Sequence, residues 1–337
     1  MSLQGFCRLA AGLLGFVAVC DSASVQAAAA PQPILVEEFD YGPDAALRLA
    51  ERWIISGGLH PDVHGLRVAA LRDPIGRSVG RFTVEQGDAL SGATEAMRLA
   101  KRYVCDLDGS KALEMEAEPG GVAPTERAEI QWKYDRRSGD GEIVRFGEPV
   151  WYRFAFKVPG DWPRDVPING RPACRTVIHQ IKQDSFKGTE SCSASPFFKI
   201  EARPLGDRIR FFAQISTGSP CTAPAMVVRR QVCATDALTR DAWHQVNVRL
   251  HPAQDASGRA DLWLNGAHCG TYLGPMGDPQ DGARREGAPI VNSQPRFGIY
   301  RDWRTAPQTI YFDRIMFWQA DPEGHPAWTV GPVPTSH

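Results

Sequence analysis

Three separate segments of the chain alternate apolar residues with polar residues that could bind a carboxylate. They are residues 127–132, 179–183 and 296–301. Successive side chains of a β-strand point to opposite faces of a sheet, so a single face can collect the polar residues of all three segments. These residues are Arg127, Glu129, Gln131, Gln180, Lys182, Arg296 and Tyr300. Arg, Gln and Lys are donors for a carboxylate, and a tyrosine hydroxyl can transfer a proton, so the pattern predicts proton-transfer chemistry on an anionic molecule.

The same three segments resemble motifs of the jelly-roll polysaccharide lyases, a group that includes alginate lyases, glucuronan lyases and heparin lyase I. The motifs are R-x-E, Q-x-H and (Y/R)-F-x-x-G-x-Y. Residues 80–88, 263–266 and 311–318 also follow the order of the glucuronan and heparin lyase I branch, and the resemblance extends over roughly residues 35–320. One position departs from the pattern, because Lys182 stands where the second motif has its histidine. The role of that histidine therefore cannot simply be carried over.

The resemblance implies an all-β fold, a concanavalin-like β-jelly-roll sandwich with a polar concave groove, and cleavage of a uronate-containing polysaccharide by β-elimination. In that reaction a base removes the proton at C5 and the C4–O bond breaks. The neighbouring carboxylate opposes the charge that develops, and donors aimed at it stabilise that charge. We expect Gln180 and Arg127 to bind this carboxylate and Tyr300 to transfer the proton. Arg296 lies four residues from Tyr300 on the same face, where its charge favours the phenolate.

Two further segments, residues 197–203 and 208–215, show the same alternation. Any one of these strands could present an ordinary solvated sheet face. A run of Arg, Lys and Gln across five strands favours the floor of a groove instead. We expect the substrate-binding residues to be Glu129, Lys182, Lys199, Arg203, Arg210 and Arg296, with Glu129 orienting Arg127 as its ion-pair partner.

The histidines have two interpretations. His179 is adjacent to Gln180 and should point to the opposite face, beside Val177 and Ile181, as a hydrogen-bonded core histidine. His60 and His64 belong to a Gly- and Pro-containing loop, where they are surface residues or the source of the missing base.

Two other functions remain open at this stage. A non-catalytic carbohydrate-binding protein would use exposed aromatic rings, for which Trp151, Trp243 and Trp263 are candidates. A glycoside hydrolase on the same sandwich would need two carboxylates flanking the scissile bond, and no Glu-x-Asp-x-Glu cluster occurs on a predicted strand.

Many short strands must position these residues. We expect strands at residues 34–40, 150–158, 176–183, 197–203, 208–215, 243–250, 260–264, 296–300 and 310–318, and helices at 44–54 and 94–104. Gly, Pro and Asp turns separate the strands, which predicts a sandwich or jelly roll. Residues 216–238 and 274–294 are expected to be long loops, which are often functional in a compact domain.

Residues 1–30 have the features of a secretory signal peptide, with an apolar run at 9–19 and four alanines at 27–30. We therefore expect a secreted or periplasmic protein whose residues 31–337 form a single domain. That part holds six cysteines, and an even number in an exported chain predicts disulfides. The pairs favoured are Cys174 with Cys192 and Cys221 with Cys233, and buried free thiols are the alternative.

The net charge of −1 gives no reason to expect a nucleic-acid or membrane partner. We expect a monomer that binds an anionic polysaccharide through a local basic groove. No Cys-x-x-Cys pair indicates zinc, and no cofactor is required. A structural calcium ion is conceivable where Glu37 or Glu38 meets Asp313, if the first and last strands pair.

Overall fold

A computed structural model describes residues 29–41, 45–55, 70–72, 78–84, 125–134, 140–164, 175–183, 196–218, 227–278, 293–302 and 306–329. The helices and strands named below belong to the compact unit formed by residues 31–337. In the described part of the chain, no helix is long and apolar enough to cross a membrane.

Two antiparallel sheets dominate this unit. Sheet A has eight strands in the order β13-β12-β11-β6-β15-β4-β3, and β1 also pairs with β15. Its strands are β1 (Leu35–Glu37), β3 (Ala70–Arg72), β4 (Ser78–Val84), β6 (Val150–Lys157), β11 (Trp243–His251), β12 (Arg259–Leu264), β13 (Ala267–Leu273) and β15 (Gln308–Trp318).

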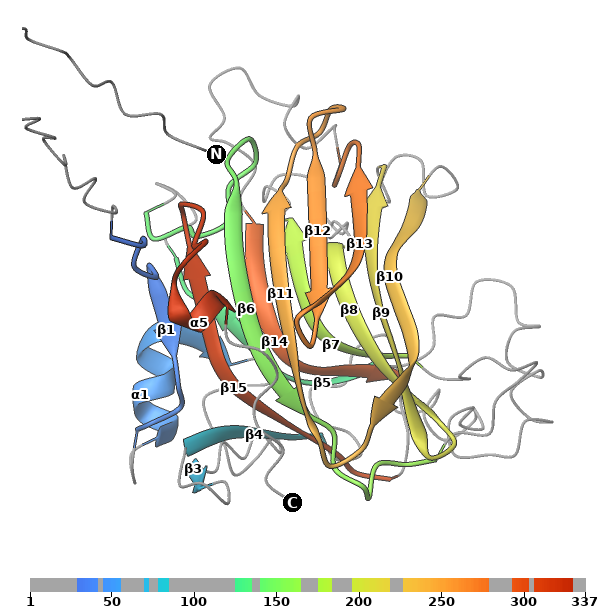
Figure 1. Ribbon diagram of the computed structural model, residues 1–337. Coiled ribbons are helices and arrows are strands. Elements are labelled where there is room, and N and C mark those ends of the chain that lie inside the picture. Colours follow the sequence, from blue (N-terminus) through green and yellow to red (C-terminus); the bar gives the residue numbers. More distant parts are fainter. Residues whose placement is uncertain are drawn as a thin grey trace, which may run out of the picture. The chain divides into compact units, whose positions relative to one another are not determined.

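Sheet B has seven strands in the order β10-β9-β8-β7-β14-β5-β2. They are β2 (Trp53–Ile55), β5 (Thr125–Trp132), β7 (Thr176–Gln183), β8 (Pro196–Leu205), β9 (Arg208–Thr217), β10 (Val228–Thr239) and β14 (Ser293–Asp302). Figure 1 shows β6, β11, β12 and β15 of sheet A in front of β7, β8 and β14 of sheet B. The predicted all-β jelly-roll sandwich is confirmed, and neither sheet closes into a barrel.

The core lies between the two sheets and is rich in aromatic rings. Phe154 of β6 packs against Phe297 of β14 with ring centroids 5.3 Å apart, and Phe156 packs against Phe211 of β9 at 6.1 Å. All four rings are fully buried. Because burial of one such side chain stabilises a fold by roughly 1.5–3 kcal/mol, these contacts fix the spacing of the sheets.

Most predicted elements are present, and the differences lie at the edges of the sheets. The predicted helix at 44–54 is α1 (Ala45–Arg52), which continues directly into β2, and a short helix, α5 (Pro326–Thr329), follows β15. Strand β13 was not predicted, and residues 228–238, predicted as loop, form most of β10. The predicted helix at 94–104 and residues 279–292 of the second predicted loop lie outside the described residues.

A two-residue turn joins β12 to β13. Asn265 and Gly266 have φ values of +52° and +80°, the left-handed backbone that a tight hairpin turn requires and that Asn-Gly adopts readily. This turn places Cys269 on the edge strand of sheet A.

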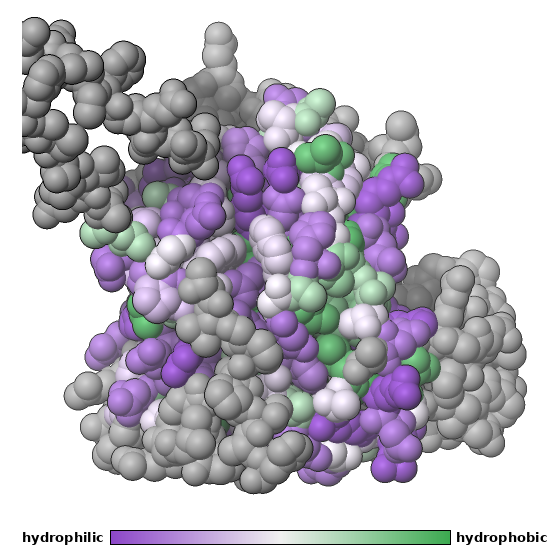
Figure 2. Space-filling view, in the orientation of Figure 1, coloured by the Kyte–Doolittle hydropathy of each residue, from purple (hydrophilic) through white to green (hydrophobic). Residues whose placement is uncertain are grey.

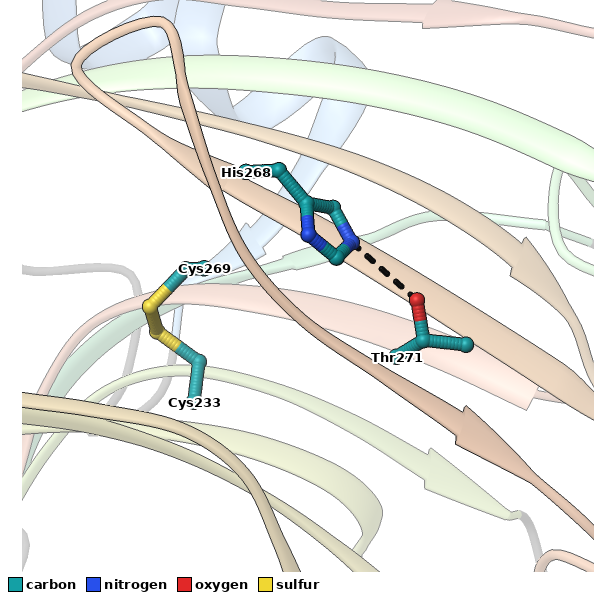
Figure 3. Close-up of a disulfide and its surroundings, with 4 residues drawn as sticks. All are labelled: Cys233, His268, Cys269 and Thr271. Atoms are coloured by element: carbon teal, nitrogen blue, oxygen red, sulfur yellow. Dashed lines mark hydrogen bonds between the residues drawn. A yellow bond between two sulfur atoms is a disulfide. The ribbon is translucent and has the colours of Figure 1, made fainter.

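A disulfide between Cys233 and Cys269 joins the edge strands of the two sheets (Figure 3). The Cα atoms are 5.3 Å apart. The predicted pairing of Cys233 with Cys221 is therefore wrong, because folding brings β10 and β13 together from positions 36 residues apart. Gly270 makes the close approach possible, since a Cβ there would overlap the Val232 carbonyl oxygen. The predicted Cys174–Cys192 pair lies outside the described residues.

Candidate active site

Sheet B carries all nine residues that the sequence predicts for catalysis and substrate binding. Strand β14 lies between β5 and β7 and sets their register. Tyr300 lies opposite Arg127 of β5, and Arg296 lies opposite Gln180 of β7. Residues directly opposite each other in a sheet share a face, so three motifs distant in sequence meet on one surface.

A pocket of about 300 Å³ lies over this surface. Six predicted residues line it: Arg127, Gln180, Lys182, Lys199, Arg296 and Tyr300. Five residues that were not predicted as site residues line it too: Arg175, Val177, Pro196, Ser216 and Arg229. The described lining contains no carboxylate, whereas five of its side chains carry positive charge besides Lys199, so the pocket suits an anion.

A hydrogen bond links β7 to β5 across the intervening strand β14. The Gln180 amide donates from Nε2 to Oε1 of Glu129 at 2.6 Å. Gly298 lies opposite Glu129 in the β14–β5 pairing, and a Cβ there would overlap the Ala128 carbonyl oxygen of β5. The sequence predicts Glu129 as the ion-pair partner of Arg127; the bond that the structure shows for its carboxylate is to Gln180. The second amide hydrogen of Gln180 remains for another acceptor.

Two guanidinium groups lie against the Tyr300 ring. The central guanidinium carbon is 5.0 Å from the ring centroid for Arg127 and 4.9 Å for Arg175. Asp302 holds Arg175 by an ion pair of 3.0 Å from Nη2 to Oδ1. These contacts surround Tyr300 with positive charge.

A β-bulge explains why the sequence pattern does not reveal Arg175. The register between β7 and its neighbours shifts between Val177 and His179. Val177 therefore lies opposite Glu201 and Tyr300 and lines the pocket, although simple alternation predicts it on the core face. The same shift puts Arg175 in the pocket together with Gln180.

Lys199 and Arg203 share one buried carboxylate on β8. Glu201 accepts from Lys199 Nζ at 2.6 Å and from Arg203 Nε at 2.6 Å, and its side chain is fully buried. Burial lowers the pKa of Lys199, although the neighbouring Glu201 acts to raise it. Lys199 lies opposite Gln180, so this pair of cations extends the site towards β9.

The groove continues over β9 and β10. A second cavity of about 780 Å³ lies there, and the Arg203 guanidinium stacks over the Phe212 ring at 5.0 Å. Arg210 donates to Asp236 at 2.6 Å. The cavity is lined by Arg203, Arg210, Phe212, Gln231, Ala234, Thr235 and Asp236. The predicted residues Arg203 and Arg210 therefore belong to this second part of the groove.

His179 is a core residue, as predicted. It is fully buried, stacks on Phe297 at 4.4 Å and contacts the Tyr152 hydroxyl through Nε2 at 3.0 Å. Burial lowers its pKa to about 3, although a hydrogen bond with the Arg296 backbone acts against this. A histidine that stays neutral inside the sandwich has no access to the groove. His60 and His64 lie outside the described residues.

The first and last strands of sheet A pair, as the calcium expectation requires, with Glu37 opposite Ile315. The Glu37 carboxylate accepts hydrogen bonds from Tyr41 and from Trp53 Nε1. Among the described residues, no three His, Cys, Asp or Glu side chains are grouped as ligands for a metal ion. Calcium binding remains a prediction.

The three candidate tryptophans belong to sheet A, away from the groove strands. Trp151 is on β6, Trp243 on β11 and Trp263 on β12. Trp151 is only 7% exposed and packs with Met316 and Trp318. The face of sheet A seen in Figure 2 mixes hydrophilic and apolar residues. The tryptophans therefore do not form a stacking platform in the groove of sheet B.

Comparison with known proteins agrees with the sequence motifs. No curated protein matches the sequence. Similar solved structures include an endo-β-1,4-glucuronan lyase from the fungus Trichoderma reesei, at 17% identity and a TM-score of 0.41, with 59% of this chain and 82% of that chain covered. An alginate lyase from Pseudomonas aeruginosa is 14% identical with a TM-score of 0.37, and 63% of this chain and 91% of that chain are covered. The polysaccharide lyase family model matches residues 79–316, which is more than two thirds of the sequence, and the chain therefore belongs to the polysaccharide lyase family.

Proposed function

We propose that this polysaccharide lyase cleaves a uronate-containing polysaccharide by β-elimination in the groove of sheet B and leaves an unsaturated uronate end. The observation that carries the proposal is the position of Tyr300. Its ring lies within about 5 Å of two guanidinium carbons, in a pocket that Gln180 also lines. A proton-transfer group and donors for a carboxylate thus share one small site.

The pocket residues divide between charge stabilisation and proton transfer. Gln180, through its second amide hydrogen, and Arg127 bind the uronate carboxylate. Tyr300, as phenolate, takes the C5 proton; the electron pair forms the C4=C5 double bond, the C4–O bond breaks, and the leaving oxygen takes up a proton. The carboxylate interaction strengthens as negative charge builds, so it lowers the barrier and not merely the KM.

Lys182 is an anchor for the anionic substrate in this proposal. It lines the pocket beside Gln180, two residues away on the same strand. A protonated lysine presents three donors and a compact charge, which suits a carboxylate better than it suits proton abstraction. Lys199, Arg203, Arg210 and Arg296 bind neighbouring sugars, Glu129 orients the Gln180 amide, and the reaction needs no cofactor.

Export is part of the proposal, because a polymer outside the cell can be reached only by an exported enzyme. The proposal also takes the enzyme to be a monomer. The apolar run at 9–19 and the alanines at 27–30 support removal of residues 1–30. N-terminal sequencing of protein recovered from the periplasm or medium tests this. An intact Met1 on that material would contradict it.

Replacement of Tyr300 by phenylalanine tests the chemistry. Loss of a proton-transfer group typically lowers the rate by about 10²–10⁴-fold, so Tyr300→Phe should lower kcat strongly while polymer binding survives. The readout is the ultraviolet absorbance of the unsaturated product, measured on a panel of uronate polymers. Tyr311→Phe is the matched control, because Tyr311 lies on sheet A and should leave turnover unchanged.

A second arm uses the substrate. Reduction of the uronate carboxyl groups to alcohols should abolish cleavage, since the C5 proton is acidic only beside that carboxyl group. Continued cleavage of the reduced polymer, or full turnover by Tyr300→Phe, would contradict elimination. Hydrolysis would then need two carboxylates that flank the scissile bond, and the described lining of the 300 Å³ pocket contains none.

A further inference from the structure

Arg175 has no counterpart among the three motifs, yet it makes one of the two cation contacts to Tyr300. We propose that Arg175 is a positioning residue for Tyr300: its guanidinium holds the phenol ring and stabilises the phenolate that abstracts the proton. This inference rests on the proposed function. It gives Arg175 a role towards Tyr300 that is separate from binding the substrate.

The position of Arg175 is fixed by Asp302 at three points. The backbone N–H of Arg175 donates to Oδ2 of Asp302 at 2.8 Å, and Nη2 pairs with Oδ1 at 3.0 Å. The backbone N–H of Asp302 donates to the Arg175 carbonyl at 3.1 Å. Asp302 is two residues from Tyr300 on β14, so the same strand carries the tyrosine and the anchor of its cation.

The role of Arg175 differs from that of Arg127. Arg127 is assigned to the uronate carboxylate, so substrate binding draws its charge towards the sugar. Arg175 already has a carboxylate partner in Asp302 and stays at the ring, 4.9 Å from its centroid, when substrate is present. A pre-organised charge of this kind costs little reorganisation when the reaction takes place.

The charges around the ring leave Arg175 protonated. Burial lowers the pKa of Arg175, but the combined effect of Asp302, Tyr300 and Glu201 raises it by more, so the net pKa lies above the ordinary value. From β5 the charged groups on the face of Tyr300 are Arg127, which lies over the ring, and Glu129, which accepts from the Gln180 amide.

The remaining neighbours add little negative charge at the ring. On β8, Glu201 forms ion pairs with Lys199 and Arg203, whose positive charges offset its negative charge. On β14, Asp302 is bound by Arg175. Arg296 on β14 and Lys182 on β7 line the same pocket. Removal of Arg175 therefore removes a cation and also leaves Asp302 without its ion-pair partner, and both changes disfavour the phenolate.

The test is the pH dependence of kcat in Arg175→Met and Arg175→Lys. If the phenolate is the active form, kcat rises with pH to a plateau. Loss of a cation beside the ring disfavours the phenolate, so Arg175→Met should move the midpoint of the rise upwards by about 1–3 pH units. Arg175→Lys keeps the charge and should restore most of the original midpoint. Arg229→Met, which removes a pocket cation on β10, should raise KM without moving the midpoint.

The outcomes separate this role from simple substrate binding or structural support. An unchanged midpoint with a raised KM in Arg175→Met would overturn the inference. So would an equal loss of kcat at every pH that Arg175→Lys does not restore. If the methionine variant does not fold, Arg175→Gln gives the same comparison, since glutamine can still donate to Asp302.

A measurement without substrate separates this inference from the proposed function. The phenolate absorbance of the wild type minus that of Tyr300→Phe follows Tyr300 alone, and the same difference in an Arg175→Met background should titrate at higher pH. A titration unaffected by Arg175→Met overturns the role of Arg175. Full turnover by Tyr300→Phe instead overturns the proposed function, whatever the titration shows.

Discussion

Gln180 donates to Glu129 across an intervening strand, because β7 and β5 both pair with β14 and not with each other. Both side chains are buried, with exposed fractions of 4% and 1%. A buried bond to a carboxylate is expected to be stronger than a neutral one. This contact therefore fixes the amide that the proposed reaction uses to bind the uronate.

A double-mutant cycle should detect this coupling in catalysis. Gln180→Ala and Glu129→Ala should each lower kcat, and the double variant should be little worse than Gln180→Ala, because Glu129 has no amide left to position once Gln180 is removed. Interacting residues of this kind show coupling energies of about 0.5–3 kcal/mol. Gln180→Ala combined with Asp236→Asn, on β10, is the control and should be additive. Additive losses for Gln180 and Glu129 would show that the bond does not position the amide.

Gly298 should be intolerant of substitution. Its φ is +139°, and a Cβ there would overlap the Ala128 carbonyl oxygen and approach the Glu129 Cα to 2.7 Å. Gly298→Ala should therefore separate β14 from β5, lower the free energy of unfolding by roughly 3 kcal/mol or more, and lower kcat.

The matched control for that prediction is Gly206→Ala. Gly206 also has a positive φ, +59°, but a Cβ there would meet no atom within 4 Å. It should cost only the backbone penalty of about 1–2 kcal/mol and leave kcat unchanged. Urea unfolding of both variants gives the comparison, and equal losses would mean that the close approach at Gly298 has no effect.

The sequence pattern predicts central strands, which pair with a neighbour on each side, better than strands at the sheet edges. Alternation identifies β7 and β9 because one face of each must be apolar. Strand β13 is not predicted because none of its residues is fully buried, so it lacks an apolar core face, and Leu273 is 68% exposed. The pattern also places Gln180 and Tyr300 correctly on one face, since each motif is short enough to keep its register.

Register shifts and long-range contacts are beyond such a pattern. The bulge in β7 reverses the alternation before His179, so the pattern does not reveal Arg175 and assigns Val177 to the core face although it lines the pocket. The partner of Cys233 depends on which edge strands meet in space, and sequence proximity to Cys221 carries no information about that. The Gln180–Glu129 bond likewise depends on the strand order of sheet B.

The disulfide between β10 and β13 should contribute measurably to stability. A link that spans 36 residues restricts the unfolded chain by about 3–4 kcal/mol on the chain-entropy account. The double variant Cys233→Ser, Cys269→Ser should therefore melt at a lower temperature than the oxidised wild type. Reductant should lower the Tm of the wild type more than that of the double variant. An identical effect of reductant on both would contradict this, and mass mapping of unreduced peptides would identify any other disulfide.

Acid should destabilise the fold through His179. A histidine has a pKa of about 6.5 in an unfolded chain, and here burial lowers it to about 3. Between these two values the unfolded state binds more protons, so stability falls as the pH falls. The expected loss is about 1.4 kcal/mol per pH unit, or about 2–3 kcal/mol from pH 7 to pH 4.5.

The hydrogen bonds of His179 identify a suitable control. The Arg296 carbonyl, 2.8 Å from Nδ1, can only accept, so Nδ1 carries the proton and Nε2 accepts from the Tyr152 hydroxyl. Glutamine can donate and accept in the same way but does not titrate. Urea unfolding at pH 7 and pH 4.5 should therefore show a smaller loss for His179→Gln than for the wild type, while His244, whose pKa burial also lowers, contributes equally to both. If wild type and variant lose the same free energy, His179 is not the group that couples stability to acid.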